Sequence, residues 1–175
     1  MTIWLLCLLL RLPVGVSQPA APPPFQKVLR FNVYTFIVKA SQADSSETAT
    51  VAAYRGSLLL TRFTQAIDGP LTGADVADLD GNRLPELYLY TSAPTSETYG
   101  RAFGWQFMPE RLATITLPGS AEPPADFRGG DRFMLTSTAL CHLIPIRTAA
   151  QPTGSARRIC YRLRPAGADY QLRAE

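Results

Sequence analysis

Hydrophobic and polar positions alternate with a period of two along most of the chain after residue 25, as in half-buried β-strands. The longest such stretch, 28–38, is rich in β-branched and aromatic residues and is predicted to form one continuous strand. Further strands are predicted at 48–54, 57–63, 74–79, 85–90, 101–108, 112–117, 133–137, 140–147, 159–163 and 170–173. The helical apolar period is absent from the sequence. Many short strands predict an all-β fold, an antiparallel β-sandwich or barrel-like single domain.

The N-terminal part of the chain departs from this alternation. Residues 1–10 form an apolar run too short to span a bilayer, and the small residues Gly15-Val16-Ser17 that follow fit a cleavage site. We therefore expect a signal peptide at 1–17, a Pro/Ala-rich leader at 18–24 and one all-β domain at 25–175. The mature protein is expected to be periplasmic or secreted, with no membrane association after the signal is removed.

Composition supports one packed domain and gives no sign of a nucleic-acid partner. The 175 residues are 46% hydrophobic and 18% charged, which supplies enough apolar material for a core. The formal net charge is only +3, and the arginines are scattered along the chain. A small cluster at Arg157, Arg158, Arg162 and Arg164 is typical of the solvated face of a strand, so binding to nucleic acid is not expected.

Two cysteines remain after the signal peptide, Cys141 and Cys160, and they are expected to pair in an oxidising compartment. Side chains alternate along a strand, so each cysteine lies on the face opposite its apolar neighbours. A hairpin with Cys141 opposite Cys160 also brings the apolar faces of its two arms into register. This register sets Leu140 opposite Tyr161 and His142 opposite Ile159. The pattern therefore predicts a disulfide on the outer face of a hairpin.

The sequence offers little for catalysis. The single histidine, His142, falls on the apolar face of its strand, where a histidine is usually a hydrogen-bonded core residue. Neither a serine nor a cysteine nucleophile has a visible partner base. An enzyme would need a cleft with perturbed carboxylates around Asp126 or Asp131. We therefore expect a protein that is not an enzyme and needs no cofactor.

An acidic turn precedes the strand at 85–90. It consists of Asp78, Asp80, Gly81 and Asn82, with Glu86 just after it. Asp78, Asp80 and Asn82 match the first three ligand positions of an EF-hand loop. However, Arg83 stands where that loop needs glycine, and Leu89 stands where it needs a glutamate. We therefore expect a structural turn without a metal, in which Asp78 and Asp80 accept backbone N–H groups while Gly81 and Asn82 are left-handed.

The strand that follows the acidic turn leads into a polar loop, residues 91–100, which ends in Tyr99 and Gly100. Loops held by a rigid sheet are where binding groups tend to lie. Two interpretations of Tyr99 stay open on this evidence. It is either a contact residue for a partner or an aromatic that folds back to cap the core.

The chain from residue 74 onward resembles the periplasmic inhibitors of invertebrate-type lysozyme. The likeness is a pattern spread over several segments rather than one short motif. Residues 75–82 and 85–90 resemble the family's turn and strand, and 96–100 resembles its inhibitory Ser-Gly-x-Tyr loop, with Glu97 in place of the glycine. The other similar segments are 130–133, 143–146, 152–154 and 161–163.

This resemblance implies an all-β domain with a protruding loop that enters the substrate cleft of an invertebrate-type lysozyme. In the family, a serine and a tyrosine hydroxyl meet the catalytic carboxylates, and charge-assisted hydrogen bonds of this kind are strong. By this likeness Ser96 and Tyr99 carry the role, and Thr98, Gly100 and Arg101 complete the partner-binding segment. The alternative is a divergent β-sandwich that binds another protein or a glycan through Glu97 and the 118–130 loop. The oligomeric state stays open, a homodimer included.

Overall fold

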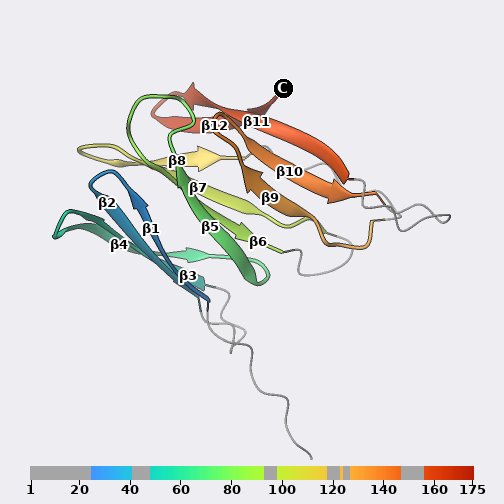
Figure 1. Cartoon of the computed structure of the whole chain (residues 1–175), viewed down its shortest axis with the longest axis horizontal. Coiled ribbons are helices and arrows are strands. Elements are labelled where there is room, and N and C mark those ends of the chain that lie inside the picture. The colour runs from blue at the N-terminus through green and yellow to red at the C-terminus, as the bar shows by residue number, and fades with distance from the viewer. Residues whose placement is uncertain (1–24, 41–47, 93–97, 118–122, 124–126, 147–155) are drawn as a thin grey trace, which may run out of the picture.

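The structure is a computed structural model that describes residues 25–40, 48–92, 98–117, 123, 127–146 and 156–175. These residues form twelve strands and no helix (Figure 1). The strands are β1 (Phe25–Phe31), β2 (Tyr34–Ala40), β3 (Thr48–Arg55), β4 (Leu58–Ala66), β5 (Leu71–Ala77), β6 (Glu86–Thr91), β7 (Ala102–Phe107), β8 (Leu112–Thr116), β9 (Arg132–Leu135), β10 (Leu140–Pro145), β11 (Ala156–Ala166) and β12 (Asp169–Ala174). No helix within the described ranges is long and apolar enough to cross a membrane.

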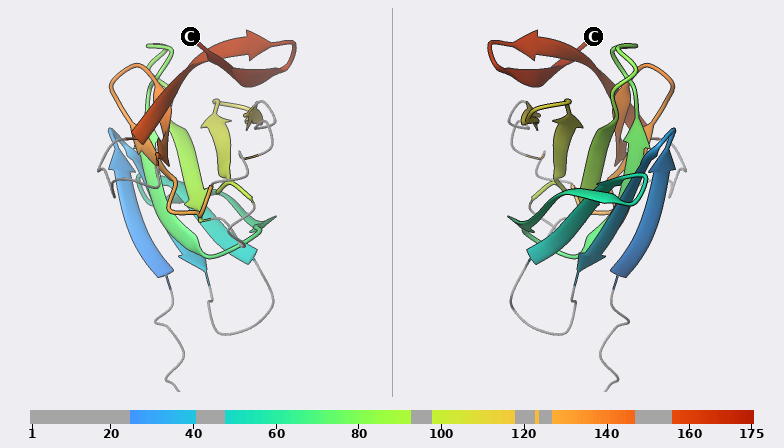
Figure 2. Two further views of the ribbon diagram at one scale, coloured as in Figure 1. Left: turned by 90° about the vertical axis from the view of Figure 1, so that its right-hand side faces the viewer. Right: turned by 90° about the vertical axis from the view of Figure 1, so that its left-hand side faces the viewer.

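The strands form two sheets. The first is an antiparallel meander in the order β1-β2-β3-β4, and the second has the order β5-β6-β7-β8-β12-β11-β10-β9. The second sheet curls into a nearly closed barrel, and its pairs are antiparallel except for the parallel pair β8–β12. Figure 2 shows the small sheet, in blue and cyan, on one side of the molecule and the red β11–β12 hairpin arching on the opposite side. The expected all-β single domain is confirmed.

Strand β6 lies between two hydrophobic cores, which explains why all six of its residues are buried. Leu87 and Leu89 face the small sheet, where they join aromatic residues such as Phe36 and Trp105. Tyr88 and Tyr90 face the interior of the barrel and pack with residues of β8, β10, β11 and β12. The Leu-Tyr-Leu-Tyr alternation therefore contributes leucines to one core and tyrosines to the other. A second link between the sheets is Lys27, whose Nζ donates to the Ala74 carbonyl at 2.6 Å and to Asp75 at 3.0 Å.

The single strand expected at 28–38 is wrong, because the chain turns back at Asn32 and Val33. Phe31 pairs with Tyr34 across this turn, so that β1 and β2 form a hairpin. Asn32 adopts a left-handed conformation with a φ of 51°. Asparagine tolerates this conformation better than most residues. Apolar, β-favouring residues continue through the turn, so the segment resembles one long strand although the buried positions change phase between Phe31 and Tyr34.

The β10–β11 hairpin has the register expected from the sequence. Cys141 pairs with Cys160, and a disulfide joins them with their Cα atoms 4.0 Å apart. Cys141 is nevertheless fully buried. The side chain of Arg158 lies across the disulfide, with Nε 3.2 Å from the Cys160 sulfur and Nη2 3.4 Å from the Cys141 sulfur. A long arginine stem commonly covers apolar surface in this way.

Candidate functional site

The two ends of β6 carry the polar groups of the candidate site. At its start, Glu86 follows the acidic turn that connects β5 to β6. At its end, Thr91 leads into the segment at 92–101, which we call the β6–β7 loop. Because β6 and β7 are adjacent and antiparallel, this loop returns to the barrel next to the point where it leaves.

Backbone hydrogen bonds hold the two ends of the β6–β7 loop together. The Thr91 N–H donates to the Arg101 carbonyl at 2.9 Å, and the Arg101 N–H donates to the Thr91 hydroxyl at 3.2 Å. The Ser92 N–H donates to the Pro70 carbonyl at 3.0 Å. Gly100 is buried against Thr91, and a Cβ added there would lie 2.3 Å from the Thr91 carbonyl oxygen. Only glycine therefore fits at this position without a backbone shift.

A buried carboxylate anchors the end of the loop. Asp131, which directly precedes β9, accepts the Gly100 N–H at 2.9 Å through Oδ2. The same oxygen lies 2.6 Å from Nε2 of His142 on β10, and both side chains are buried. A carboxylate oxygen accepts hydrogen bonds, so this geometry fits an imidazole that carries a proton on Nε2. The expectation that His142 is a hydrogen-bonded core residue is confirmed.

Tyr99 packs onto this anchor. Its ring meets His142 edge-on with centroids 5.2 Å apart, and it meets Phe127 edge-on at 4.8 Å. His142 in turn stacks on Phe133 at 4.5 Å. Tyr99 remains partly exposed. It therefore folds back onto the barrel while keeping part of its surface on the outside.

The other expected partner-binding residues lie on both sides of Tyr99. Thr98 is exposed, and Arg101 is exposed with its Nε 2.7 Å from Asp68 Oδ2. Ser96 and Glu97 lie outside the described residues, as do the signal peptide, the leader and most of 118–126. The structure thus brings Thr98, Tyr99, Gly100 and Arg101 together where the chain enters β7.

The acidic turn is built from side-chain hydrogen bonds to its own backbone, as expected. The Asn82 N–H donates to Asp80 Oδ1 at 3.1 Å, and the Arg83 N–H donates to Asp78 Oδ2 at 2.9 Å. Gly81 is left-handed with a φ of 75°, also as expected. The left-handed conformation expected for Asn82 belongs instead to Arg83, with a φ of 68°. The side chain of Asn82 is engaged on both sides, donating to Asp80 and accepting the Leu84 N–H.

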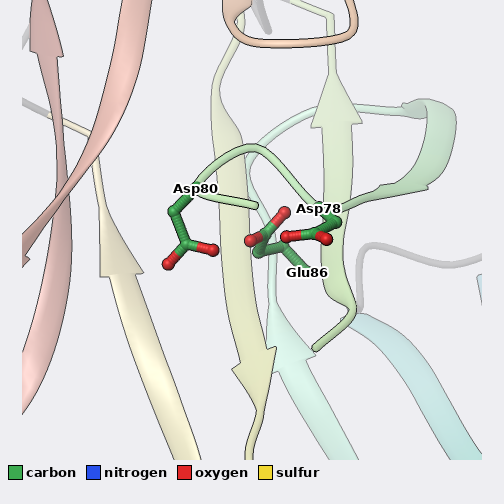
Figure 3. A group of neighbouring side chains, drawn as sticks. All are labelled: Asp78, Asp80 and Glu86. Carbon is green, nitrogen blue, oxygen red and sulfur yellow. The ribbon is translucent and has the colours of Figure 1, made fainter. Parts of the chain in front are cut away.

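Glu86 is fully buried and lies beside the two aspartates (Figure 3). Asp78, Asp80 and Glu86, which we call the acidic cluster, each place one oxygen within 4.8 Å of the others. The pKa of Glu86 is raised from 4.5 to about 8, and burial is the main cause. The Leu79 N–H, which donates to Glu86 Oε2, opposes this shift. The negative charges of Asp80 and Asp78 add to it. Among the carboxyl groups that the structure describes, Glu86 thus has the most strongly shifted pKa.

Sequence reasoning considered Asp131 only as a carboxylate of an enzyme and missed its pairing with His142, and it missed Gln106 altogether. Asp131 pairs with His142 across neighbouring strands, and no fixed spacing connects them in the sequence. Gln106 on β7 is fully buried and lies opposite Glu86 in the β6–β7 register. In the sequence, Gln106 stands between Trp105 and Phe107. A glutamine between two aromatic residues is a weak signal of a buried polar side chain. Both residues become visible only when the strand order is known.

A scan against protein-family models finds no family that matches this chain, and a search of curated proteins finds no matching protein. The fold therefore defines the class of protein: a single all-β domain with a barrel-like sheet and one disulfide.

Proposed function

We propose that the protein is a periplasmic or secreted inhibitor of invertebrate-type lysozyme, which it binds through the β6–β7 loop. It is a binding protein and not an enzyme. The proposal starts from the resemblance of residues 74 onward to that inhibitor family. The observation that carries it is the anchor beneath the loop, where buried Asp131 holds Gly100 and His142 supports Tyr99.

The anchor fixes the C-terminal end of the loop before a partner arrives. Thr98 and Tyr99 reach the surface from a backbone that is held by Asp131 and by the Thr91–Arg101 hydrogen bonds. A segment that is already ordered loses less conformational entropy on docking. Affinity that depends on a few hydroxyl groups benefits most from such ordering.

Tyr99 is suited to a contact with a buried carboxylate of the partner. Its ring is held by His142 and Phe127, which restricts the positions open to its hydroxyl. A phenol donates to a carboxylate in a charge-assisted hydrogen bond, and an aromatic anchor adds contact area at low entropy cost. Ser96 supplies the second hydroxyl in this proposal.

One exposed positive charge lies beside the loop, and it is paired with a carboxylate. Arg101 is two residues from Tyr99 and exposed, although Asp68 compensates part of its charge. Positive charge at the rim of an interface raises the rate of association with an acidic partner. The Cys141–Cys160 disulfide is compatible with the oxidising compartment in which such an inhibitor would act.

The test is an inhibition assay of the purified mature protein against invertebrate-type, chicken-type and goose-type lysozymes. We expect inhibition of the invertebrate type. Ser96→Ala and Tyr99→Phe should each raise the inhibition constant about 30-fold, because each removes a hydroxyl bond worth roughly 2 kcal/mol. Tyr99→Phe keeps the ring contacts with His142, so it separates the hydroxyl from the anchor.

Ser137→Ala and Tyr170→Phe are the matched controls, since each removes only the same hydroxyl group, from the exposed turn after β9 and from β12. Glu97→Gly restores the family's glycine and should strengthen inhibition. If neither wild type nor Glu97→Gly inhibits any lysozyme, the proposed function is wrong. If the protein inhibits and both loop variants keep the wild-type constant, the loop is not the binding segment.

A further inference from the structure

The outer face of the sheet formed by β9 to β12 concentrates positive charge. Side chains alternate along a strand, so the residues on either side of a core residue point outward. On β11 the core residues are Tyr161 and Leu163, and on β12 the core residue is Leu172. The outward-pointing arginines of these strands, which we call the basic face, are Arg132, Arg158, Arg162, Arg164 and Arg173.

The strand register brings these arginines side by side. Arg162 on β11 lies directly opposite Arg173 on β12. Arg158 and Arg132 lie on either side of Leu143, which belongs to β10. A strand advances about 3.3 Å per residue, so the row along β11 from 158 to 164 extends over about 20 Å. The basic face is therefore one continuous surface that crosses four strands.

Few carboxylates balance this charge. Glu175 pairs with Arg162, and Asp169 at the hairpin turn accepts a backbone N–H from β8. The other four arginines of the basic face form no salt bridge with a carboxylate of the described ranges. The whole chain has 17 basic and 14 acidic residues, so this surface concentrates charge that the chain as a whole nearly balances.

The centre of the basic face has a reason to bind an anion. Arg162 and Arg173 are like charges directly across neighbouring strands, and such pairs destabilise a sheet. Glu175 compensates one of the two. The N–H donors of a guanidinium form a planar fork that matches the oxygens of an acidic group. An anionic group bound beside Arg173 would therefore relieve the remaining repulsion.

The composition and shape of the basic face favour a flexible polar chain. Within the described strands it presents no aromatic side chain, and Met134 is its only exposed large hydrophobic residue. Base stacking and protein–protein hot spots rely on aromatic side chains, and membrane insertion relies on apolar area. The face is also the outside of a barrel, where the β11–β12 hairpin arches (Figure 2). A flat bilayer would touch few of its arginines at once.

We propose that the basic face binds a linear acidic polysaccharide, whose carboxylate or sulfate groups accept hydrogen bonds from the arginines. This function goes beyond lysozyme inhibition and does not depend on it. His142, which supports the β6–β7 loop, is buried on the inner side of β10, whereas Leu143 lies on the outer side between two arginines of the basic face. The two binding surfaces therefore belong to opposite faces of one sheet.

The test is a calorimetric titration of the mature protein with heparin, a linear polysaccharide that carries sulfate and carboxylate groups. We expect binding that weakens on the order of tenfold between about 50 mM and about 200 mM salt, because each ion pair releases counterions. Uncharged dextran should not bind. Arg164→Ala combined with Arg173→Ala should weaken heparin binding about tenfold at the lower salt concentration.

Arg30→Ala combined with Arg55→Ala is the matched control. It removes the same charge from exposed positions of the small sheet, and it should bind heparin within about twofold of wild type because distant charges are screened. Arg164→Lys combined with Arg173→Lys retains both charges and should bind more tightly than the alanine variant. This comparison separates the loss of charge from a loss of folding.

The absence of heparin binding at the lower salt concentration overturns the proposal. Wild-type affinity in the Arg164→Ala and Arg173→Ala variant also overturns it, as does an equal loss in the control. Tighter binding to duplex DNA or to phosphatidylglycerol vesicles than to heparin overturns the choice of a polysaccharide. Ser96→Ala and Tyr99→Phe should bind heparin as wild type does, so failure of the inhibitor proposal and failure of this one are distinguishable.

Discussion

The two ends of β6 bury a carboxyl group in opposite ways. At the loop end, Asp131 Oδ2 receives a backbone N–H and lies 2.6 Å from the imidazole of His142. At the turn end, Glu86 receives the Leu79 N–H but has two aspartates beside it. The first carboxyl is compensated by the chain itself. The second faces groups of its own charge.

This difference shows what a buried carboxyl requires. Removing a carboxylate from water is costly unless a positive or hydrogen-bonding partner replaces the water. His142 and Gly100 fill that role for Asp131. For Glu86, a proton has to fill it. The turn end is therefore expected to respond to pH through Glu86.

The largest expected effect is a pH dependence at the turn end. The pKa of Glu86 is about 8 in the folded protein and 4.5 in the reference state, so the folded state holds the proton more tightly. The free energy of unfolding should therefore fall as pH rises from about 4.5 to about 8, by roughly 4 kcal/mol. Urea unfolding at pH 5 and pH 8.5 measures the fall.

Glu86→Gln is the control for this pH dependence, because it keeps the shape and removes the titrating proton. Its free energy of unfolding should lack most of the fall seen in wild type. Equal pH dependence in the two proteins would show that Glu86 is not the group responsible.

The next largest effect is expected when the buried carboxylate of Asp131 is removed. Asp131→Ala leaves the Gly100 N–H and the His142 ring buried without their acceptor, which should cost about 3 kcal/mol. Urea unfolding at neutral pH provides the measurement. Asp169→Ala, on an exposed turn, should cost less than 1 kcal/mol because its bond to Thr114 is at the surface. A similar loss in both variants would contradict the anchoring role of Asp131.

A smaller effect should follow from Gly100→Ala. The added Cβ would meet the Thr91 carbonyl oxygen, so the backbone has to move and the Gly100 N–H is displaced from Asp131. We expect a loss of about 2 kcal/mol, as for other overpacked sites. Amide hydrogen exchange of Gly100 and Arg101 should also accelerate. Wild-type stability together with wild-type exchange would show that the loop end adjusts freely.

The smallest effect is expected for Asp80→Asn at pH 8. Asp80 is exposed, and its charge is a lesser cause of the raised pKa of Glu86. Its removal should stabilise the protein by less than about 1 kcal/mol. Urea unfolding of the two proteins side by side detects this gain. A destabilisation of several kcal/mol would mean that Asp80 is essential to the turn itself.

The sequence predicted features that depend on local alternation. The fold class, most strands and the register that pairs Cys141 with Cys160 follow from a period of two and from turn residues. The hairpin at Asn32 was missed because apolar, β-favouring residues continue on both sides of it and the change of phase at Val33 and Tyr34 was not read as a turn. The acidic turn was predicted from its hydrogen-bonding residues, although Arg83 rather than Asn82 takes the left-handed conformation.

Features that join distant strands were not predictable. Asp131 and His142 are brought together by β9 and β10, and Gln106 reaches Glu86 only because β7 pairs with β6. Alternation also cannot tell which outward positions are covered, as Arg158 covers Cys141. These are consequences of strand order, which the pattern of a single strand does not contain.

The parallel pair β8–β12 has a consequence for how the molecule folds. Thr114 donates to Asp169, 55 residues further along, whereas each strand of β1–β4 pairs with its neighbour in the chain. Local pairings form quickly, while long-range pairings first have to bring distant segments together. The meander should therefore assemble early, and closure of the barrel should be the slow step. Until β12 reaches β8, the tyrosines of β6 remain accessible to water and to chaperones.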